Sequence, residues 1–202
     1  MLRRIFISLS LTLAAAGSAH ATPSVGQAAP DFALKDVAGK TVKLSDYRGK
    51  HVVLEWTNPQ CPYVKKHYNS GNMPATQKEA VEKGVVWLSI DSTEKASWEY
   101  MEPAKVAAWQ GERKARPSAL LSDPEGTAGK AHGARTTPHL YIVDPQGRLI
   151  YAGGIDSIPS SDPGDIKTAV NYVRQGLSEA LAGKPISAAT TRPYGCSIKY
   201  KS

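Results

Sequence analysis

The sequence predicts an α/β protein, a three-layer α/β/α sandwich with helices on both faces of a central mixed sheet. Two observations favour this fold. Short β-branched and aromatic runs alternate with helical segments, and a strand hairpin and a closing helix follow them. The chain has 202 residues, 41% of them hydrophobic and 21% charged, which is enough for one packed domain and excludes a disordered or collagen-like chain.

The first part of the chain predicts a hairpin, a strand and a helix start. Residues 25–50 are rich in turn residues, which predicts a small β-hairpin around Gly39, an N-terminal extension of the sandwich. Residues 51–56 are β-branched and aromatic, typical of a buried central strand. Pro62 suits the first turn of a helix, where its missing N–H costs nothing, so we expect Cys61 at or near the N-cap.

Helices and strands alternate along the middle of the chain. We expect helices over 63–68, 74–83, 103–113 and 126–132, and strands over 84–90 and 118–121. After Pro138, a strand over 139–143 turns and returns through 148–151. Sheets of this kind place ligands and chemistry at the C-terminal end of a central strand, and Cys61 lies at that end of the first one.

The last predicted helix runs from a cap at Asp165 to about Ala182, and Gly183 ends it. Its apolar face would carry Ile166, Val170, Val173, Leu177 and Leu181. Residues 184–202 show no periodicity. We expect them to form a C-terminal tail that carries Cys196 and has few other residues to anchor it.

Residues 1–21 have the pattern of a secretory signal peptide: a basic start, a short apolar run and a small-x-small end. Cleavage would leave a domain over 22–183 and the tail over 184–202, in the periplasm or secreted. The apolar run is too short to cross a bilayer, so no stable membrane insertion is expected. Loss of its two arginines would lower the formal charge from +7 to +5, more typical of a solvated surface than of a nucleic-acid groove, so no nucleic-acid partner is expected.

The chain has only two cysteines, Cys61 and Cys196. This count excludes a disulfide-dense scaffold and any four-cysteine zinc or iron–sulfur site within one chain. An even count in an exported protein favours pairing, and the long loop closed by such a bond would contribute about 4–5 kcal/mol in the chain-entropy model. The sequence leaves open whether the two sulfurs meet.

Cys61 is the candidate nucleophile. A thiolate at a helix start faces unpaired backbone N–H groups and the positive end of the helix dipole. Lys65 lies one turn later, and Lys66 and His67 follow it, so these side chains would also favour the charged sulfur. Taken alone, the two lysines are more typical of a solvated helix face.

Several segments resemble the thioredoxin superfamily, and within it the peroxiredoxin-like branch (AhpC/TSA, redoxin domain). They are residues 26–32 (GQAAPDF), residues 44–50 (LSDYRGK) before a hydrophobic strand, Cys61 at a strand-to-helix junction, and Thr137-Pro138 before a hairpin. Residues 58–68 and 194–200 are similar to an exported subgroup of redoxin-domain proteins. The resemblance implies a thioredoxin-like fold in which Pro138 is a cis-proline that faces Cys61.

The function that this resemblance implies is that of an exported thiol-dependent oxidoreductase, which acts on disulfides or hydroperoxides through Cys61 and uses no cofactor. Cys196 would be its resolving cysteine or disulfide partner. A thiol or disulfide protein or a small hydroperoxide would be the substrate, and the electron donor is undetermined. The substrate groove would be shaped by Thr137, Pro138, Pro62 and Tyr63.

The chain departs from the family patterns at three positions. Thioredoxins use Cys-x-x-Cys, but Val64 stands at the second cysteine, so no local disulfide can form. Peroxiredoxins have Pro seven residues and Thr three residues before the cysteine, where this chain has Leu54 and Asn58. Asn58 could still donate a hydrogen bond to a peroxide oxygen, but the missing hydroxyl argues against efficient peroxidase activity.

Two further interpretations stay open beside the enzyme. One is a binding or structural module of the same fold that holds a static Cys61–Cys196 crosslink. The other is a metal site in which Cys61, His67 and His139 imitate the copper-carrying members of the superfamily. Those proteins use two neighbouring cysteines and a histidine, so we expect no metal here.

Overall fold

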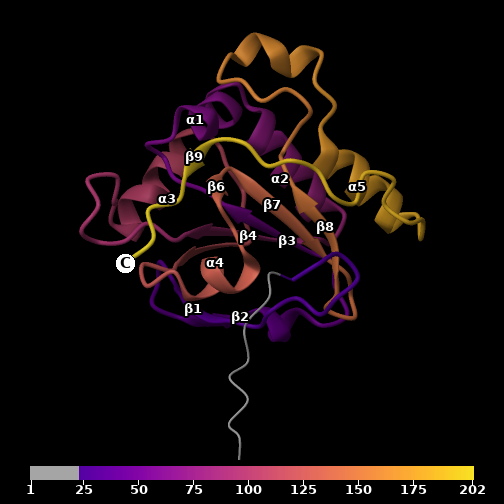
Figure 1. The fold of residues 1–202 in the computed structure, drawn as a ribbon, viewed down its shortest axis with the longest axis horizontal. Coiled ribbons are helices and arrows are strands. Elements are labelled where there is room, and N and C mark those ends of the chain that lie inside the picture. Colours follow the sequence, from indigo (N-terminus) through magenta and orange to yellow (C-terminus); the bar gives the residue numbers. More distant parts are fainter. Residues whose placement is uncertain (1–22) are drawn as a thin grey trace, which may run out of the picture.

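The computed structural model describes residues 23–202, so the expected signal peptide lies outside the described part of the chain. The central sheet has seven strands in the order β2-β1-β5-β4-β3-β7-β8 (Figure 1). They are β1 (Ala33–Asp36), β2 (Thr41–Lys43), β3 (Val52–Trp56), β4 (Val86–Asp91), β5 (Ala119–Ser122), β7 (His139–Val143) and β8 (Leu149–Gly153). β6 (Thr136–Thr137) and β9 (Cys196–Ser197) form a second, two-stranded sheet.

Five α-helices accompany these strands within residues 23–202. They are α1 (Pro62–Asn69), α2 (Asn72–Glu82), α3 (Pro103–Glu112), α4 (Thr127–His132) and α5 (Tyr172–Leu181), and two 3-10 helices are η1 (Leu44–Tyr47) and η2 (Pro163–Lys167). None of these helices combines the length and the apolar character needed to cross a bilayer.

The predicted hairpin around Gly39 is confirmed and is part of the main sheet. Gly39 has a φ of 79°, which glycine adopts without steric cost, and the flanking strands pair antiparallel with Leu34 opposite Val42. β1 also pairs with β5, through Lys35 and Ser122. The hairpin therefore adds two strands to one edge of the sheet.

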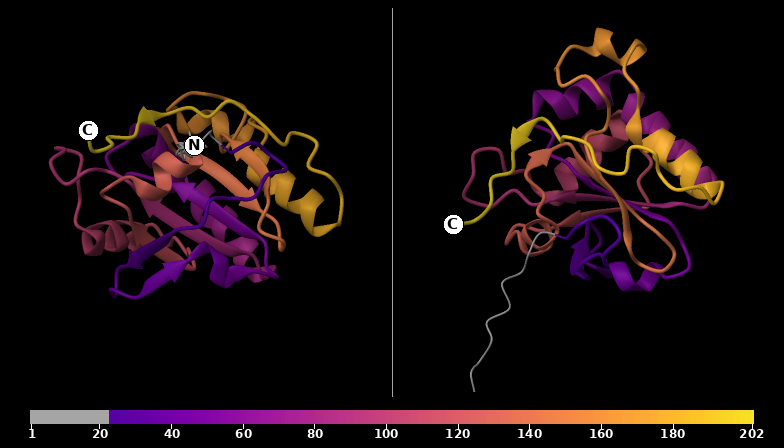
Figure 2. Two further views of the ribbon diagram at one scale, coloured as in Figure 1. Left: turned by 60° about the horizontal axis from the view of Figure 1, so that its bottom comes forward. Right: turned by 45° about the vertical axis from the view of Figure 1, so that its right-hand side comes forward.

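β3 lies in the middle of the sheet and directs alternate side chains to opposite faces. It pairs parallel with β4 and antiparallel with β7, which makes the sheet mixed as predicted. Leu54 and Trp56 pack on the face that α4 and the N-terminal segment cover. Val53 packs on the other face, with residues of α1, α2 and α5. Figure 2 shows these two layers on either side of the strands.

Glu55 places a carboxylate on the second face, with no exposed surface. Four side chains donate hydrogen bonds to it: Tyr68 (2.8 Å), Gln77 (3.0 Å), Trp87 (2.7 Å) and Ser89 (3.0 Å). Burial raises the pKa of Glu55, although the four donors act in the opposite direction. This carboxylate links β3 and β4 to α1 and α2.

We expect Glu55→Leu to lower the free energy of unfolding by about 3–5 kcal/mol, because four buried donors lose their acceptor. Denaturant unfolding at neutral pH measures this change. Glu82→Leu is the matched control: the Glu82 side chain is 64% exposed, so its replacement should change stability by less than about 0.5 kcal/mol. Equal effects of the two substitutions would contradict the structural role of Glu55.

The prediction that the last helix begins at Asp165 is wrong. α5 begins after Asn171, whose side chain accepts a hydrogen bond from Arg174 N at 3.0 Å. An isolated antiparallel bridge to Asp156 holds Asn171 itself extended, so the earlier residues form only the separate 3-10 helix η2 and the α-helix starts after Asn171. Val170, expected on the apolar face, is 49% exposed.

The expectation that residues 184–202 have few anchoring residues is also wrong. Tyr194 is buried, and Ile186 and Ile198 pack against the two sides of the core. The Tyr200 hydroxyl donates to the carbonyl oxygen of Ala134 at 2.8 Å. This tail runs from α5 past β6 toward α4, and β9 lies within it (Figures 1 and 2).

Candidate active site

Cys61 is the N-cap of α1, with extended backbone angles and Pro62 as the first helical residue. This confirms the predicted placement at the end of the first central strand. Cys61 is only 1% exposed, and its thiol donates a hydrogen bond to the carbonyl oxygen of Thr137 at 3.0 Å. The free N–H groups of the first turn lie at the sulfur's end of the helix.

Cys196 reaches the same point from the tail. β9 pairs antiparallel with β6 so that Cys196 lies opposite Thr137, the residue that accepts the hydrogen bond from Cys61. Both thiols are free, and Cys61 and Cys196 belong to the same packed cluster of side chains. Burial, and then the contact with Cys61, raise the pKa of Cys196 well above its ordinary value. The two cysteines therefore lie beside the same residue, Thr137, in the folded protein.

Gly195 permits this approach of the tail to β6. Its φ of +135° is one that L side chains rarely adopt, and a Cβ there would lie 2.0 Å from the carbonyl oxygen of Thr137. A larger residue would push β9 away from β6, and Cys196 with it.

The Thr137–Pro138 peptide bond is cis, as the resemblance implied. Pro138 is buried, Pro62 is exposed, and Tyr63 is half-buried with its ring edge-on to Tyr194 at 5.8 Å. A cavity of about 440 Å³ lies beside the tail. Its lining includes Thr136, Asp156, Tyr172, Arg192, Tyr194 and Gly195, and not the four residues predicted for a groove.

Asn58 is buried and holds the loop that precedes Cys61. Its side-chain oxygen accepts a hydrogen bond from Gln60 N at 2.7 Å, and its amide nitrogen donates to Thr93 Oγ1 at 2.8 Å. The backbone carbonyl oxygen of Asn58 accepts a hydrogen bond from Cys61 N at 3.1 Å. The amide predicted to meet a peroxide oxygen is thus already bound to neighbouring residues.

Lys65 and Lys66 lie in different environments, although they are neighbours on α1. Lys65 is half-buried, and its backbone N–H donates to the carbonyl of Cys61 at 2.9 Å. Lys66 is 2% exposed, so a solvated helix face is the wrong interpretation for it. Its ammonium group donates to the carbonyl of Ser160 at 3.0 Å and lies 3.9 Å from Asp156 Oδ2.

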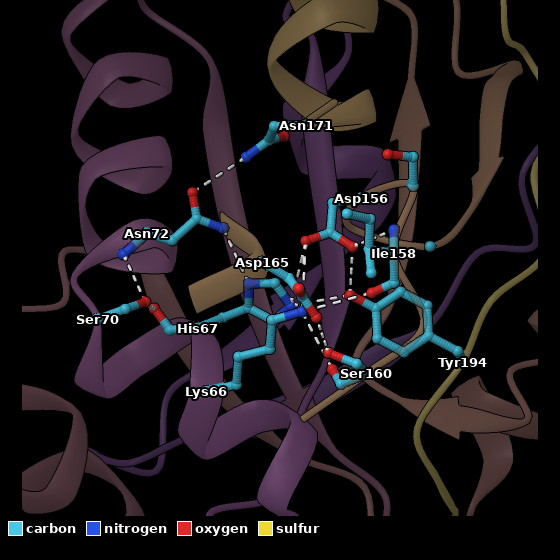
Figure 3. Close-up of polar contacts among 12 residues, drawn as sticks. Lys66, His67, Ser70, Asn72, Asp156, Ile158, Ser160, Asp165, Asn171 and Tyr194 are labelled. Carbon is cyan, nitrogen blue, oxygen red and sulfur yellow. Dashed lines mark hydrogen bonds and ion pairs between the residues drawn. The ribbon is translucent and has the colours of Figure 1, made fainter. Parts of the chain in front are cut away.

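His67 brings no positive charge to Cys61 at neutral pH, contrary to the sequence-based expectation. Burial, and then the charge of Lys66, lower its pKa to about 3. Its Nε2 lies 3.1 Å from the hydroxyl of Tyr194, and Nδ1 lies 2.9 Å from the amide of Asn72 (Figure 3). Nothing in the sequence around Asp156 or Tyr194 indicates a role for them, because their partners are about 90 and 130 residues away along the chain.

The suggested metal ligands do not assemble. His139 Nδ1 lies 3.3 Å from the hydroxyl of Tyr141, and His67 faces Tyr194. Between residues 23 and 202, the structure brings together no group of three or more His, Cys, Asp or Glu side chains that could hold a metal ion.

The sequence model of the AhpC/TSA family matches residues 25–152. The chain belongs to the AhpC/TSA family. This confirms the resemblance inferred from the sequence motifs. The match includes Cys61 and Pro138 and ends before the tail that carries Cys196.

Relatives of this AhpC/TSA protein include the thiol-disulfide oxidoreductase ResA of Geobacillus kaustophilus, which is 41% identical over 133 residues, covering 62% of this chain and 67% of ResA. An uncharacterized conserved protein from the same organism superimposes with a TM-score of 0.72 at 28% identity, over 88% of this chain and 93% of its own. A putative thiol:disulfide interchange protein DsbE from Chlorobium tepidum superimposes with a TM-score of 0.53 at 23% identity, over 64% of this chain and 84% of its own. The predicted thioredoxin-like fold is confirmed.

Proposed function

We propose that this AhpC/TSA protein is an exported thiol-disulfide oxidoreductase in which Cys61 and Cys196 alternate between dithiol and disulfide. The position of both cysteines beside Thr137 carries the proposal, because Cys61 donates to the carbonyl of Thr137 and Cys196 lies opposite Thr137 in the paired strands. α1 has Val64 at the position where thioredoxins have their second cysteine, and the tail supplies the second cysteine, Cys196, instead. Export rests on the signal-peptide pattern in the sequence.

Cys61 attacks first. Its thiolate displaces one sulfur of a substrate disulfide, which leaves as a thiolate, and a mixed disulfide forms between Cys61 and the other sulfur. Cys196 then attacks Cys61 Sγ, the mixed disulfide breaks, and the second substrate thiol leaves. The substrate gains two electrons and two protons, and the protein becomes the Cys61–Cys196 disulfide. An external thiol donor restores the dithiol.

The two thiols differ in a way that sets this order. Cys61 is the N-cap of α1, whereas Cys196 lies in the C-terminal tail. Burial, and then the proximity of Cys61, raise the pKa of Cys196 and so hold its thiol protonated. The contribution of Cys61 ends when Cys61 enters a mixed disulfide, which makes deprotonation of Cys196 easier at the step in which it attacks.

The geometry favours disulfides over hydroperoxides as substrates. The amide of Asn58 is bound to Thr93 and to the backbone of Gln60, and the hydroxyl that peroxiredoxins have at this position is missing.

Thiol counting on the mature protein tests the proposal. After reduction, the folded protein should carry two thiols that react with an alkylating agent. After exposure to excess oxidised glutathione it should carry none, with an intact mass lower by two hydrogens and without bound glutathione. Millimolar dithiothreitol should restore both thiols without denaturant.

Cys196→Ser is the control for this experiment. It should retain a glutathione adduct on Cys61, since no second thiol can release it. Wild-type protein that keeps both thiols free in oxidised glutathione would contradict the redox proposal. A disulfide that resists reduction until the protein unfolds would support the static structural module.

A further inference from the structure

Tyr194, two residues before Cys196, has its hydroxyl in a buried polar cluster (Figure 3). The hydroxyl donates a short hydrogen bond to Asp156 Oδ1. His67 Nδ1 accepts from the Asn72 amide, so the proton of the neutral ring is on Nε2 and points to the Tyr194 oxygen. We call Tyr194, Asp156, His67 and Lys66 the tail anchor.

The tail anchor connects the two cysteines through one helix. Lys66 and His67 belong to α1, the helix that has Cys61 as its N-cap. The ammonium group of Lys66 lies 5.8 Å from the centre of the Tyr194 ring, within range of a cation–π contact. One rigid element thus presents Cys61 at its end and holds the segment before Cys196 at its side.

Burying the charged side chains of the tail anchor costs free energy. Lys66 is 2% exposed and Asp156 is 3% exposed. Asp156 Oδ2 accepts no hydrogen bond within the described residues, and it lies 3.9 Å from Lys66 Nζ and 3.8 Å from His67 Nε2. Buried charges with incomplete hydrogen bonding contribute little to stability compared with apolar side chains of similar volume. Buried charges that contribute little to stability are typical of functional positions.

Local structure alone cannot fix Cys196. β9 has two residues and pairs with a two-residue partner, β6, which is too short to be stable by itself. Gly195 gives the chain rotational freedom immediately before Cys196. The first buried side chain upstream of Cys196 is Tyr194. Ile198 and Tyr200 hold the chain after Cys196, and Tyr194 is the residue that holds it before Gly195.

We propose that the tail anchor positions Cys196 for its attack on Cys61, an inference that rests on the proposed function. In that step a bond forms between the two protein sulfurs, the bond from Cys61 to the substrate sulfur breaks, and the proton of Cys196 ends on the departing thiol. The tail anchor touches none of the reacting atoms. It raises the effective concentration of the second thiol by restricting where the tail can go.

Tyr194→Phe removes the hydroxyl and keeps the ring. We expect the equilibrium constant of the Cys61–Cys196 disulfide against glutathione to fall at least about tenfold, which makes its reduction potential about 30 mV less negative. Release of glutathione from the mixed disulfide should slow by a similar factor. In a Cys196→Ser background, Tyr194→Phe should leave the alkylation rate of Cys61 unchanged, since the tail anchor acts on the second thiol.

Tyr141→Phe is the matched control, because the Tyr141 hydroxyl is buried and donates to the carbonyl of His132 at 3.1 Å, outside the tail anchor. It should lower the melting temperature without changing the glutathione equilibrium. If Tyr194→Phe does not fold, Asp156→Asn, which keeps an acceptor but removes the charge, should lower the equilibrium constant at least about threefold.

Each outcome decides one question. An equilibrium constant unchanged by Tyr194→Phe, or changed equally by Tyr141→Phe, would overturn the positioning role while leaving the proposed function intact. An unchanged glutathione equilibrium constant in Asp156→Asn would also overturn the positioning role. Wild-type protein that forms no Cys61–Cys196 disulfide in glutathione buffer would instead overturn the proposed function itself.

Discussion

Replacing Cys61 with serine is expected to lower disulfide reductase activity on the order of 10³-fold or more. A serine hydroxyl stays protonated at neutral pH and does not form the mixed disulfide on which the reaction depends. The assay follows reduction of an aromatic disulfide by dithiothreitol, in which the released thiolate absorbs light. The first turnover is resolved by rapid mixing.

Cys196→Ser separates the two steps of the reaction. It should retain the first, stoichiometric release of aromatic thiolate, because Cys61 and its helix are intact. Later turnovers should then depend on direct attack by dithiothreitol on the mixed disulfide. Full activity of Cys61→Ser, or loss of the first release in Cys196→Ser, would contradict the assignment of Cys61 as the attacking residue.

Stability is expected to fall steeply as the pH drops below about 6.5, because three histidines are buried in the neutral form. Burial is the main cause in each case and lowers the pKa of His67 to about 3, of His132 to about 4 and of His139 to about 3. His132 shows the cost of protonation most directly, since its Nε2 is buried without a hydrogen-bond partner among the described residues.

The direction of this change in stability depends on whether the folded or the unfolded protein binds more protons. Below pH 6.5 the unfolded chain protonates these histidines and the folded protein does not, so each one removes up to about 1.4 kcal/mol of stability per pH unit. Asp91 and Glu55 act in the opposite direction, because burial raises their pKa values, that of Asp91 to about 6. We expect a net loss of about 3–5 kcal/mol between pH 7 and pH 5.

Denaturant unfolding of the reduced protein at several pH values between 7.5 and 5 measures this loss. His132→Gln should flatten the dependence by about 1.4 kcal/mol per pH unit, and His51→Gln, at a half-buried position, should change it much less. Titration of the histidine ring signals by NMR gives the same information for the wild type. Stability that stays constant or rises from pH 7 to pH 5 would contradict the prediction.

Local patterns were sufficient for the sheet and for one end of the active site. The run of β-branched residues in β3, followed by Cys61-Pro62, predicted a central strand and a helix start because both depend on residues that are neighbours in the chain. The start of α5 was not predictable in this way. Its position depends on a bridge between Asp156 and Asn171, and apolar spacing carries no information about that contact.

Lys66 and His67 show the limit of sequence reasoning about chemistry. Two consecutive basic residues on a short helix usually lie in solvent. Here they are buried because Asp156 and Tyr194, distant in sequence, provide a carboxylate and a hydroxyl for them. A side chain's charge state and role depend on such partners, and the sequence alone does not show which partners meet.

The sequence by itself determined the family, the thioredoxin-like sheet, the place of Cys61 at a helix start and the lack of a second cysteine on that helix. These features depend on residue types and on short spacings along the chain. Only the tertiary structure decided that Cys196 meets Cys61 and that α1 holds the tail that brings it there. The physical reason is that these residues are 135 positions apart (Cys61 and Cys196) and 127 positions apart (His67 and Tyr194), and their contacts depend on how strands and helices pack rather than on any local preference of the chain.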